Sequence, residues 1–224
     1  MKWRHIWLAL ALAALAGCTS TSTGTLASPQ PSPSVIPSPF AVAWAQECGL
    51  GSSLPPAGLL GISERPPVSA VGVSQTQAQT WADGLLRSLA LKQWAEANLQ
   101  DTVLSSGCLG NALAANDDLM AIAQAKANGG QVDYESGTIS SLSVRAATSN
   151  EKAATGDNYA IEATGTGPSG LWVVDPQGLK VAVGSLRVDA GQEFKVAFVG
   201  HYNDQTGVWA LDATIECKVN APCS

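Results

Sequence analysis

The spacing of hydrophobic positions changes near the middle of the chain. Between residues 74 and 128, apolar residues recur every three or four positions, which predicts helices. Ser74, followed three residues later by Gln77, makes a capping-box pattern at the start of the first helix. The apolar stripe of that helix consists of Ala78, Trp81, Ala82, Leu85 and Leu89. Lys92 and Glu96, farther along the same helical run, are expected to point outward.

From residue 131 to residue 217 the period becomes two, so one face of each segment is apolar and the other polar. This alternation is typical of antiparallel strands. The predicted strands span residues 131–146, 157–166, 171–175, 179–188, 192–202 and 207–217. In the last strand, Trp209 and Leu211 are expected on the dry face, with Thr214 and Glu216 on the wet one. The alternation slips at Gly184-Ser185, which predicts a β-bulge.

Helices followed by strands predict an α+β fold, with N-terminal helices packed on a bent antiparallel β-sheet. The order of elements over roughly residues 74–217 resembles the nuclear transport factor/ketosteroid isomerase-like superfamily. The resemblance rests on Trp81-Ala82-Asp83-Gly84-Leu85-Leu86, on Lys92-Gln93-Trp94 with Leu99-Gln100-Asp101-Thr102-Val103, and on Gly207-Val208-Trp209. It implies a cone in which curved strands wrap the helices. An open β-sandwich and other cystatin-like arrangements remain alternatives.

The first 17 residues are typical of a cleaved export signal. Lys2 and Arg4 precede an apolar run over residues 6–16, which is shorter than the roughly 20 residues that a membrane-spanning helix needs. Leu15-Ala16-Gly17-Cys18 resembles the bacterial lipobox, which implies that Cys18 becomes a lipid-modified N-terminus. The alternative is an ordinary signal peptide whose Cys18 enters a disulfide.

Composition separates a tether from a domain in the remaining chain. Residues 18–43 are rich in Ser, Thr and Pro and predict a disordered tether. Residues 44–224 are expected to form one α+β domain, which begins with an irregular arm over residues 44–73. Removing residues 1–17 takes away Lys2 and Arg4 but no acidic residue, which leaves 10 basic and 18 acidic residues and a net charge near −8. This charge argues against a nucleic-acid partner.

The cysteines that follow Cys18 form an even set, Cys48, Cys108, Cys217 and Cys223. In an exported protein, an even set indicates two disulfides. We expect the pairs Cys48–Cys108 and Cys217–Cys223. A zinc site is the alternative, but the spacings are wide and no C-x-x-C pair occurs.

Candidate catalytic residues are few and their surroundings in the sequence are ordinary. His201 could act as a general base oriented by Asp204, but its strand parity predicts a solvated position. Asp101 is expected to be a turn residue and Tyr134 a residue at the margin of the core. We therefore assign no catalytic residue, no cofactor and no metal from the sequence. A possible ligand pocket would be lined by Trp81, Leu85, Tyr134, Phe194, Phe198 and Trp209.

Together these features predict a lipoprotein of the cell envelope, anchored on the extracytoplasmic side through lipid on Cys18. Its partners would be the membrane and another envelope protein, and its domain would have a non-catalytic binding or assembly role. Two alternatives remain, a small-molecule-binding protein and an enzyme of the isomerase or hydrolase kind. The enzyme hypothesis requires a buried acid or histidine that faces a cavity.

Overall fold

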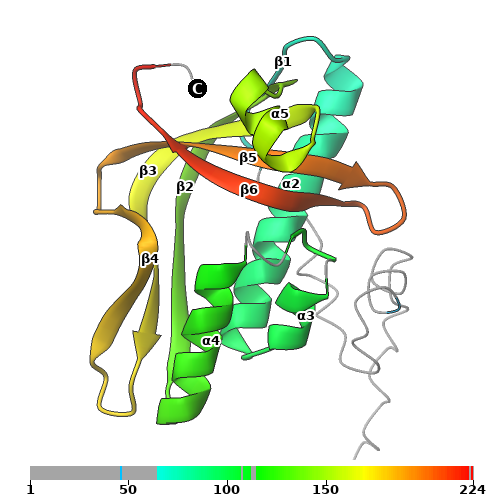
Figure 1. Ribbon diagram of the computed structural model, residues 1–224. Helices are drawn as coiled ribbons and strands as arrows, with labels where there is room; N and C mark the ends of the chain where they lie inside the picture. Colours follow the sequence, from blue (N-terminus) through cyan, green and yellow to red (C-terminus); the bar gives the residue numbers. More distant parts are fainter. Residues whose placement is uncertain (1–45, 47–64, 107, 112–114, 222, 224) are drawn as a thin grey trace, which may run out of the picture. The chain divides into compact units, whose positions relative to one another are not determined.

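A computed structural model describes residue 46 and residues 65–106, 108–111, 115–221 and 223 (Figure 1). The described elements combine helices with a mixed sheet, so the α+β class is confirmed. In chain order they are β1 (Val68–Ala70), α2 (Gln75–Ala97), α3 (Asp101–Ser105), α4 (Asn116–Asn128), β2 (Gln131–Ala146), α5 (Ser149–Thr155), β3 (Tyr159–Val174), β4 (Lys180–Val188), β5 (Glu193–Asn203) and β6 (Val208–Cys217).

The sheet is mixed because its first strand comes from the segment that was expected to be an irregular arm. The strand order is β1-β2-β3-β5-β6, and β1 runs parallel to β2, with Val68 opposite Leu142. All other pairings among the described strands are antiparallel. The prediction of a wholly antiparallel sheet is therefore wrong at this edge, since a three-residue strand is too short to show a period in the sequence.

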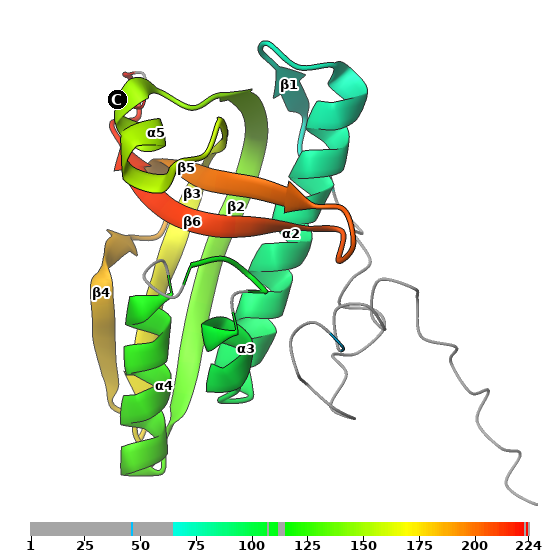
Figure 2. The same ribbon diagram turned by 45° about the vertical axis from the view of Figure 1, so that its right-hand side comes forward.

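β3 has a different partner at each of its two ends. Its first half, residues 159–166, pairs with β5, and its second half, residues 169–174, pairs with β4. The two strands predicted over this region are thus one continuous strand. The pairing of β3 with β4 shifts register between Val183 and Val188, where the sequence predicted a bulge at Gly184-Ser185. In both views β5 and β6 run across the direction of α2 (Figures 1 and 2).

α2 packs on the sheet through its apolar stripe. Its N-cap is Ser74, whose side chain accepts a hydrogen bond from the backbone N–H of Gln77, as the capping-box pattern predicts. Ala78, Ala82 and Leu85 are fully buried and belong to a cluster that also contains Leu142, Ile161 and Trp209. Gly84 permits the close approach, because a Cβ there would lie 2.8 Å from the ring of Tyr202.

A short helix, α5, is absent from the sequence-based prediction. Thr148 and Glu151 form a complete capping box at its start, and Gly156 ends it in a left-handed conformation. The Thr-x-x-Glu spacing was therefore a usable signal. The helix was missed because its seven residues are too few to show an apolar stripe.

The predictions for the first part of the chain fall almost entirely outside the described residues. These are the signal peptide, the lipid-modified Cys18, the tether over residues 18–43 and most of the arm. In the part of the chain that the structure describes, no helix is both long and apolar enough to cross a membrane.

Cys217 and Cys223 are joined by a disulfide, with their Cα atoms 5.0 Å apart, which is the C-terminal pairing that we expected from the sequence. Cys108 is buried and disulfide-bonded. Its expected partner, Cys48, lies outside the described residues, so that pairing stays a prediction.

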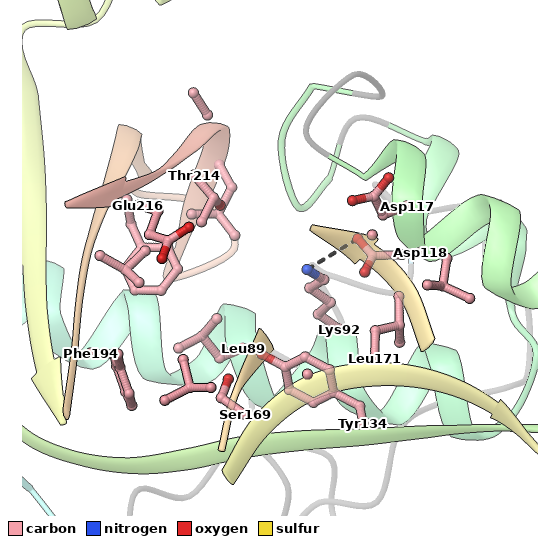
Figure 3. A pocket seen from close by; sticks show the side chains of 18 of the residues that line it. Leu89, Lys92, Asp117, Asp118, Tyr134, Ser169, Leu171, Phe194, Thr214 and Glu216 are labelled. Carbon is pink, nitrogen blue, oxygen red and sulfur yellow. Dashed lines mark ion pairs between the residues drawn. The ribbon is translucent and has the colours of Figure 1, made fainter. Parts of the chain in front are cut away.

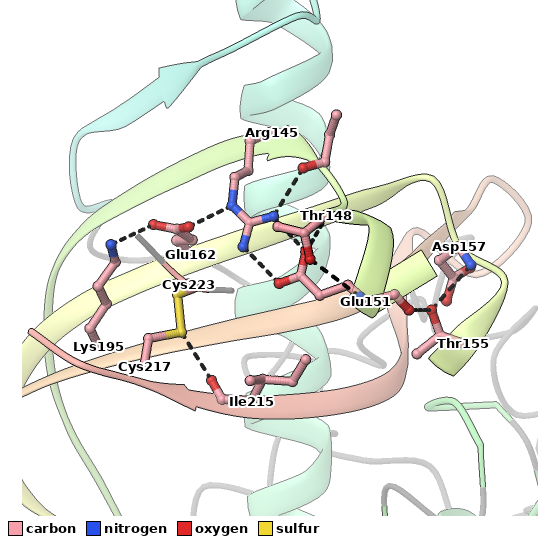
Figure 4. Close-up of polar contacts among 11 residues, drawn as sticks. Arg145, Thr148, Glu151, Thr155, Asp157, Glu162, Lys195, Ile215, Cys217 and Cys223 are labelled. Atoms are coloured by element: carbon pink, nitrogen blue, oxygen red, sulfur yellow. Dashed lines mark hydrogen bonds and ion pairs between the residues drawn. A yellow bond between two sulfur atoms is a disulfide. The ribbon is translucent and has the colours of Figure 1, made fainter. Parts of the chain in front are cut away.

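A network of buried ion pairs holds α5 against the sheet (Figure 4). Arg145 of β2 donates two hydrogen bonds of 2.7 Å to the carboxylate of Glu151, which is 1% exposed. Arg145 also pairs with Glu162 of β3, and Lys195 of β5 reaches the same carboxylate at 3.0 Å. The hydrogen bonds from Arg145 hold the pKa of Glu151 below its ordinary value of 4.5. One helix and three strands are thus joined through four charged side chains.

Removing Arg145 should destabilise the fold strongly. In Arg145→Met, the carboxylate of Glu151 stays buried without its guanidinium partner, so we expect the free energy of unfolding at pH 7 to fall by about 3–5 kcal/mol in urea denaturation. Because the pKa of Glu151 is lowered by folding, the stabilisation is present at neutral pH and is lost as the pH falls below about 4.5.

The matched control is Arg187→Met. Arg187 pairs with Asp189 on the surface, where the two side chains are 63% and 65% exposed, so the loss should stay below about 1 kcal/mol. Equal losses in the two variants would show that the buried network contributes nothing beyond a surface ion pair.

Candidate functional site

A cavity of about 530 Å³ lies where β3 exchanges one partner strand for the other (Figure 3). α2 and the start of α4 contribute to its wall, together with β2, β3, β4, β5 and β6. Its apolar lining consists of Leu89, Ile139, Leu171, Val183, Val188, Phe194, Val196, Phe198, Leu211 and Ala213. The cavity lies within the 300–1,000 Å³ range that is common for small-molecule sites.

One wall carries a charged pair. Lys92 of α2 and Asp118 of α4 both line the cavity, and Lys92 Nζ lies 3.0 Å from Asp118 Oδ2. The Asp118 side chain is 5% exposed and that of Lys92 is 20% exposed. Burial opposes the charge of Lys92, but the attraction of Asp118 acts in the other direction, and the pKa of the ammonium group is raised. The expectation that Lys92 points outward is wrong.

Behind this pair lies a second carboxyl group, that of Glu96. It follows Lys92 by one helical turn and is fully buried, so the expectation that it points outward is also wrong. Burial raises the pKa of Glu96 to about 9, and the neighbouring Asp118 acts in the same direction, although the charge of Lys92 opposes it. Among the described residues, no hydrogen bond reaches either carboxyl oxygen of Glu96. A buried carboxyl group without a partner is less costly in its neutral form, so Glu96 keeps its proton at neutral pH.

Tyr134 closes the cavity next to the charged pair. Lys92 Nζ lies 5.8 Å from the centre of its ring, within the range of a cation–π contact. Burial raises the pKa of the phenol, so the hydroxyl stays protonated at neutral pH. Tyr134 can thus offer an O–H donor at the same wall that presents a carboxylate and an ammonium group.

The opposite wall is polar because of a bulge in β6. Val199 is opposite Ala213, whereas the next residue, Gly200, is opposite Leu211, so Asp212 has no partner on β5. The bulge reverses the alternation, and both Thr214 and Glu216 line the cavity that Leu211 also lines. The expectation that Thr214 and Glu216 face away from the side of Leu211 is therefore wrong.

The structure separates the six pocket residues proposed from the sequence. Tyr134, Phe194 and Phe198 line the cavity. Trp81 and Trp209 instead border a second hollow, and their rings pack 5.7 Å apart. Leu85 is fully buried in the core between α2 and the sheet. The three residues outside the cavity belong to one cluster, in which Trp81 and Leu85 of α2 pack on Trp209 of β6.

The candidate catalytic residues occupy different places. Asp101 is half exposed and forms an ion pair with Lys126 at 2.7 Å, which lowers the pKa of its carboxyl group. His201 has a 62% exposed side chain, and its Nδ1 lies near Asp157 and Asp212. The solvated position that the strand parity predicts for His201 is thus confirmed, and its neighbours are two aspartates other than Asp204.

The cavity brings together groups that bind and orient molecules. The buried Asp118 meets the requirement that we set for an enzyme, but its charge is already neutralised by Lys92 at 3.0 Å. Sequence reasoning missed Lys92, Glu96, Asp117, Asp118 and Glu216. Charged residues at helical or alternating positions resemble a solvated face in a sequence. The packing that buries Glu96 and Asp118 and the β6 bulge that turns Glu216 toward the cavity are visible only in three dimensions.

Glu96 makes stability depend on pH in an unusual direction. The folded protein keeps the proton on Glu96 up to about pH 9, whereas the unfolded chain releases it near 4.5. The folded state thus binds more protons in this range, so this group makes the free energy of unfolding fall as pH rises, by at most about 1.4 kcal/mol per pH unit. Urea denaturation, measured at intervals of about one pH unit between pH 5 and pH 9, should show this slope.

Glu96→Gln keeps a neutral, hydrogen-bonding side chain and should remove that contribution. Glu193→Gln, at an exposed position on β5, is the control and should leave the slope unchanged. Parallel pH profiles for the wild type and Glu96→Gln would contradict the assignment of a neutral carboxyl group.

In comparisons with known proteins, no protein-family model, no curated protein and no solved structure matches the chain.

Proposed function

We propose that this protein binds a small, largely apolar molecule in the cavity between α2, α4 and the sheet. The observation that carries the proposal is a space of about 530 Å³ with an apolar lining and polar groups confined to two walls. Such a combination favours recognition of a ligand by shape and by a few oriented polar contacts.

The arrangement of helices against the sheet supports the same proposal. In the cone that the superfamily resemblance implies, N-terminal helices pack on a bent sheet and leave room between them. The packing of α2 on β2 and β6, and the exchange of partners along β3, are what such a cone requires. The pocket would be the interior of this cone.

The charges around the cavity restrict the ligand. Asp117, Asp118, Asp212 and Glu216 line it, and Lys92 is the one cation among the described residues of its lining. Since Lys92 is already paired with Asp118, the remaining field is negative. We infer that the ligand is uncharged or carries an amine, and that an anionic molecule such as a fatty acid is disfavoured.

The pairing of the most buried acid at the wall supports binding without chemical conversion. Asp118 faces the cavity but is paired with Lys92, and the carboxyl group that holds a proton, Glu96, is not in the lining. The isomerase or hydrolase alternative would need one of these groups to reach the ligand unpaired.

The proposed location comes from the start of the sequence. Leu15-Ala16-Gly17-Cys18 supports a lipid anchor on Cys18, which would hold the binding domain on the extracytoplasmic side of a membrane. The Ser/Thr/Pro-rich segment over residues 18–43 would act as a spacer between membrane and domain.

Ligand binding can be tested with a pair of fluorescent probes of opposite character. The neutral N-phenyl-1-naphthylamine should bind saturably, with a blue shift on entry into the apolar cavity, and the anionic 1-anilinonaphthalene-8-sulfonate should bind more weakly. Thr214→Trp fills the cavity from an exposed position on its wall and should weaken binding of the neutral probe by at least about tenfold, because the probe and the indole compete for one space.

Thr166→Trp is the matched control, because Thr166 is exposed on β3 and does not line the cavity. Glu216→Lys should reverse the preference by improving binding of the anionic probe. Absence of saturable binding, or equal loss in the two tryptophan variants, would overturn the proposal.

The anchor has a separate test. Cys18→Ala should prevent lipid attachment and move the protein from the membrane fraction to the soluble fraction, and metabolic labelling with palmitate should disappear in parallel. Cys48→Ala is the control and should keep the label. Unchanged membrane association of Cys18→Ala would defeat the lipobox assignment, whatever the result for the cavity.

A further inference from the structure

Three side chains from separate parts of the chain, of which Asp212 also lines the cavity, converge around His201. Asp157 follows α5, His201 lies on β5 and Asp212 lies at the bulge of β6. His201 Nδ1 is 3.4 Å from Asp157 Oδ1 and 3.2 Å from Asp212 Oδ2. One donor atom from each residue lies within 4.8 Å of the other two.

We propose that Asp157, His201 and Asp212 bind a divalent ion of the zinc class. Nitrogen and oxygen ligands lie at about 2.0–2.1 Å from zinc, and at a tetrahedral angle two such ligands are about 3.3 Å apart. The two distances from His201 Nδ1 bracket this value. His201 Nδ1 therefore stands from each carboxylate at the spacing expected of two ligands of one ion.

The ligands are held in place before any ion binds. The bulge removes Asp212 from the pairing of β5 and β6 and directs it toward His201, a common use of bulges next to functional sites. Asp157 follows Gly156, which ends α5 in a left-handed conformation, and its backbone N–H donates to Thr155 Oγ1 at 3.1 Å. The ion pair between Glu151 and Arg145 in turn fixes α5 (Figure 4).

One carboxylate oxygen at the site, Asp157 Oδ2, lacks a hydrogen-bond partner. This atom is buried, and no N–H or O–H group of the described residues reaches it. A buried carboxylate oxygen without a partner is costly, and it is rare in folded proteins. His201 contacts the other oxygen, Oδ1, and a cation bound there would neutralise the carboxylate to which Oδ2 belongs.

The surroundings leave room for a further ligand. Asp157 and His201 border a hollow of about 550 Å³, which is also lined by Trp81, Tyr159 and Trp209. Trp209 Nε1 is buried and has no hydrogen-bond partner among the described residues. With three protein ligands, a zinc-class ion keeps an open position for water or for an oxygen or nitrogen ligand.

The donor set selects the kind of ion. Imidazole nitrogen suits zinc, nickel, cobalt and copper, whereas calcium and magnesium prefer sets made of oxygen alone. The 62% exposed imidazole gives the ion access from solvent. We therefore expect Zn²⁺ and Co²⁺ to bind and Mg²⁺ and Ca²⁺ to have little effect.

Titration of the untagged full-length chain with ZnCl₂ tests the proposal by calorimetry and by the thermal shift that the metal induces. We expect one saturable site and a rise in Tm that EDTA reverses. Asp212→Asn and His201→Gln should each weaken Zn²⁺ binding by at least about tenfold, since each removes a ligand. The metal-induced shift is the relevant quantity, because relief of repulsion between Asp157 and Asp212 can alter the stability of the metal-free variants.

Asp204→Asn is the matched control. Asp204 borders the same hollow but is not one of the three proposed ligands, so binding should be unchanged. Co²⁺ provides a second readout, with visible bands of a tetrahedral site and without the near-ultraviolet bands of cysteine ligation. Absence of saturable Zn²⁺ binding, thiolate bands with Co²⁺, or equal weakening by Asp204→Asn would each overturn the proposal.

Discussion

Where β5 and β6 pair, Gly200 faces Leu211 and the residue before it faces Ala213, which leaves Asp212 outside the ladder. This single extra residue determines the character of two regions. On one side it turns Thr214 and Glu216 into the cavity, and on the other it brings Asp212 to His201. A strand without the bulge would keep strict alternation, so Thr214 and Glu216 would lie on the face opposite to Leu211. The polar wall of the cavity and the cluster at His201 therefore depend on one departure from regular pairing.

The charged groups beside the cavity are expensive to bury, and their arrangement limits that cost. Lys92 and Asp118 compensate each other, and Glu96 avoids a third charge by keeping its proton. A buried ion pair contributes little net stability compared with apolar side chains of the same size. The protonated Glu96 also makes the cavity sensitive to alkaline pH, because its ionisation would place two like charges side by side.

The network around Arg145 connects the short helix α5 with the sheet and with the proposed metal ligands. Glu151 caps α5 and binds Arg145, and Asp157 emerges directly from the end of the same helix. A seven-residue helix is unstable by itself, because helix nucleation is costly and tertiary contacts supply most of its stability. The position of Asp157 thus depends on the ion pairs that Arg145 of β2 forms with Glu151 and with Glu162 of β3. Disruption of that network should loosen the loop while leaving the cavity on the other side of β6 intact.

The sequence by itself determined the α+β class, the positions of the long helix and of most strands, and the bulge near Gly184, because each leaves a periodic pattern or a break in one. It also led us to Tyr134, Phe194 and Phe198, since large apolar side chains on one face of a strand collect around any space that the fold leaves. Only the tertiary structure decided that Lys92, Glu96 and Asp118 are buried together, that Thr214 and Glu216 face a cavity, and that His201 meets Asp157 and Asp212. These contacts join residues far apart in the chain, and a charged residue has the same local pattern whether it faces water or a partner. Whether a charged side chain is buried depends on which other helix or strand packs over it. The sequence of the element that carries the charge does not contain this information.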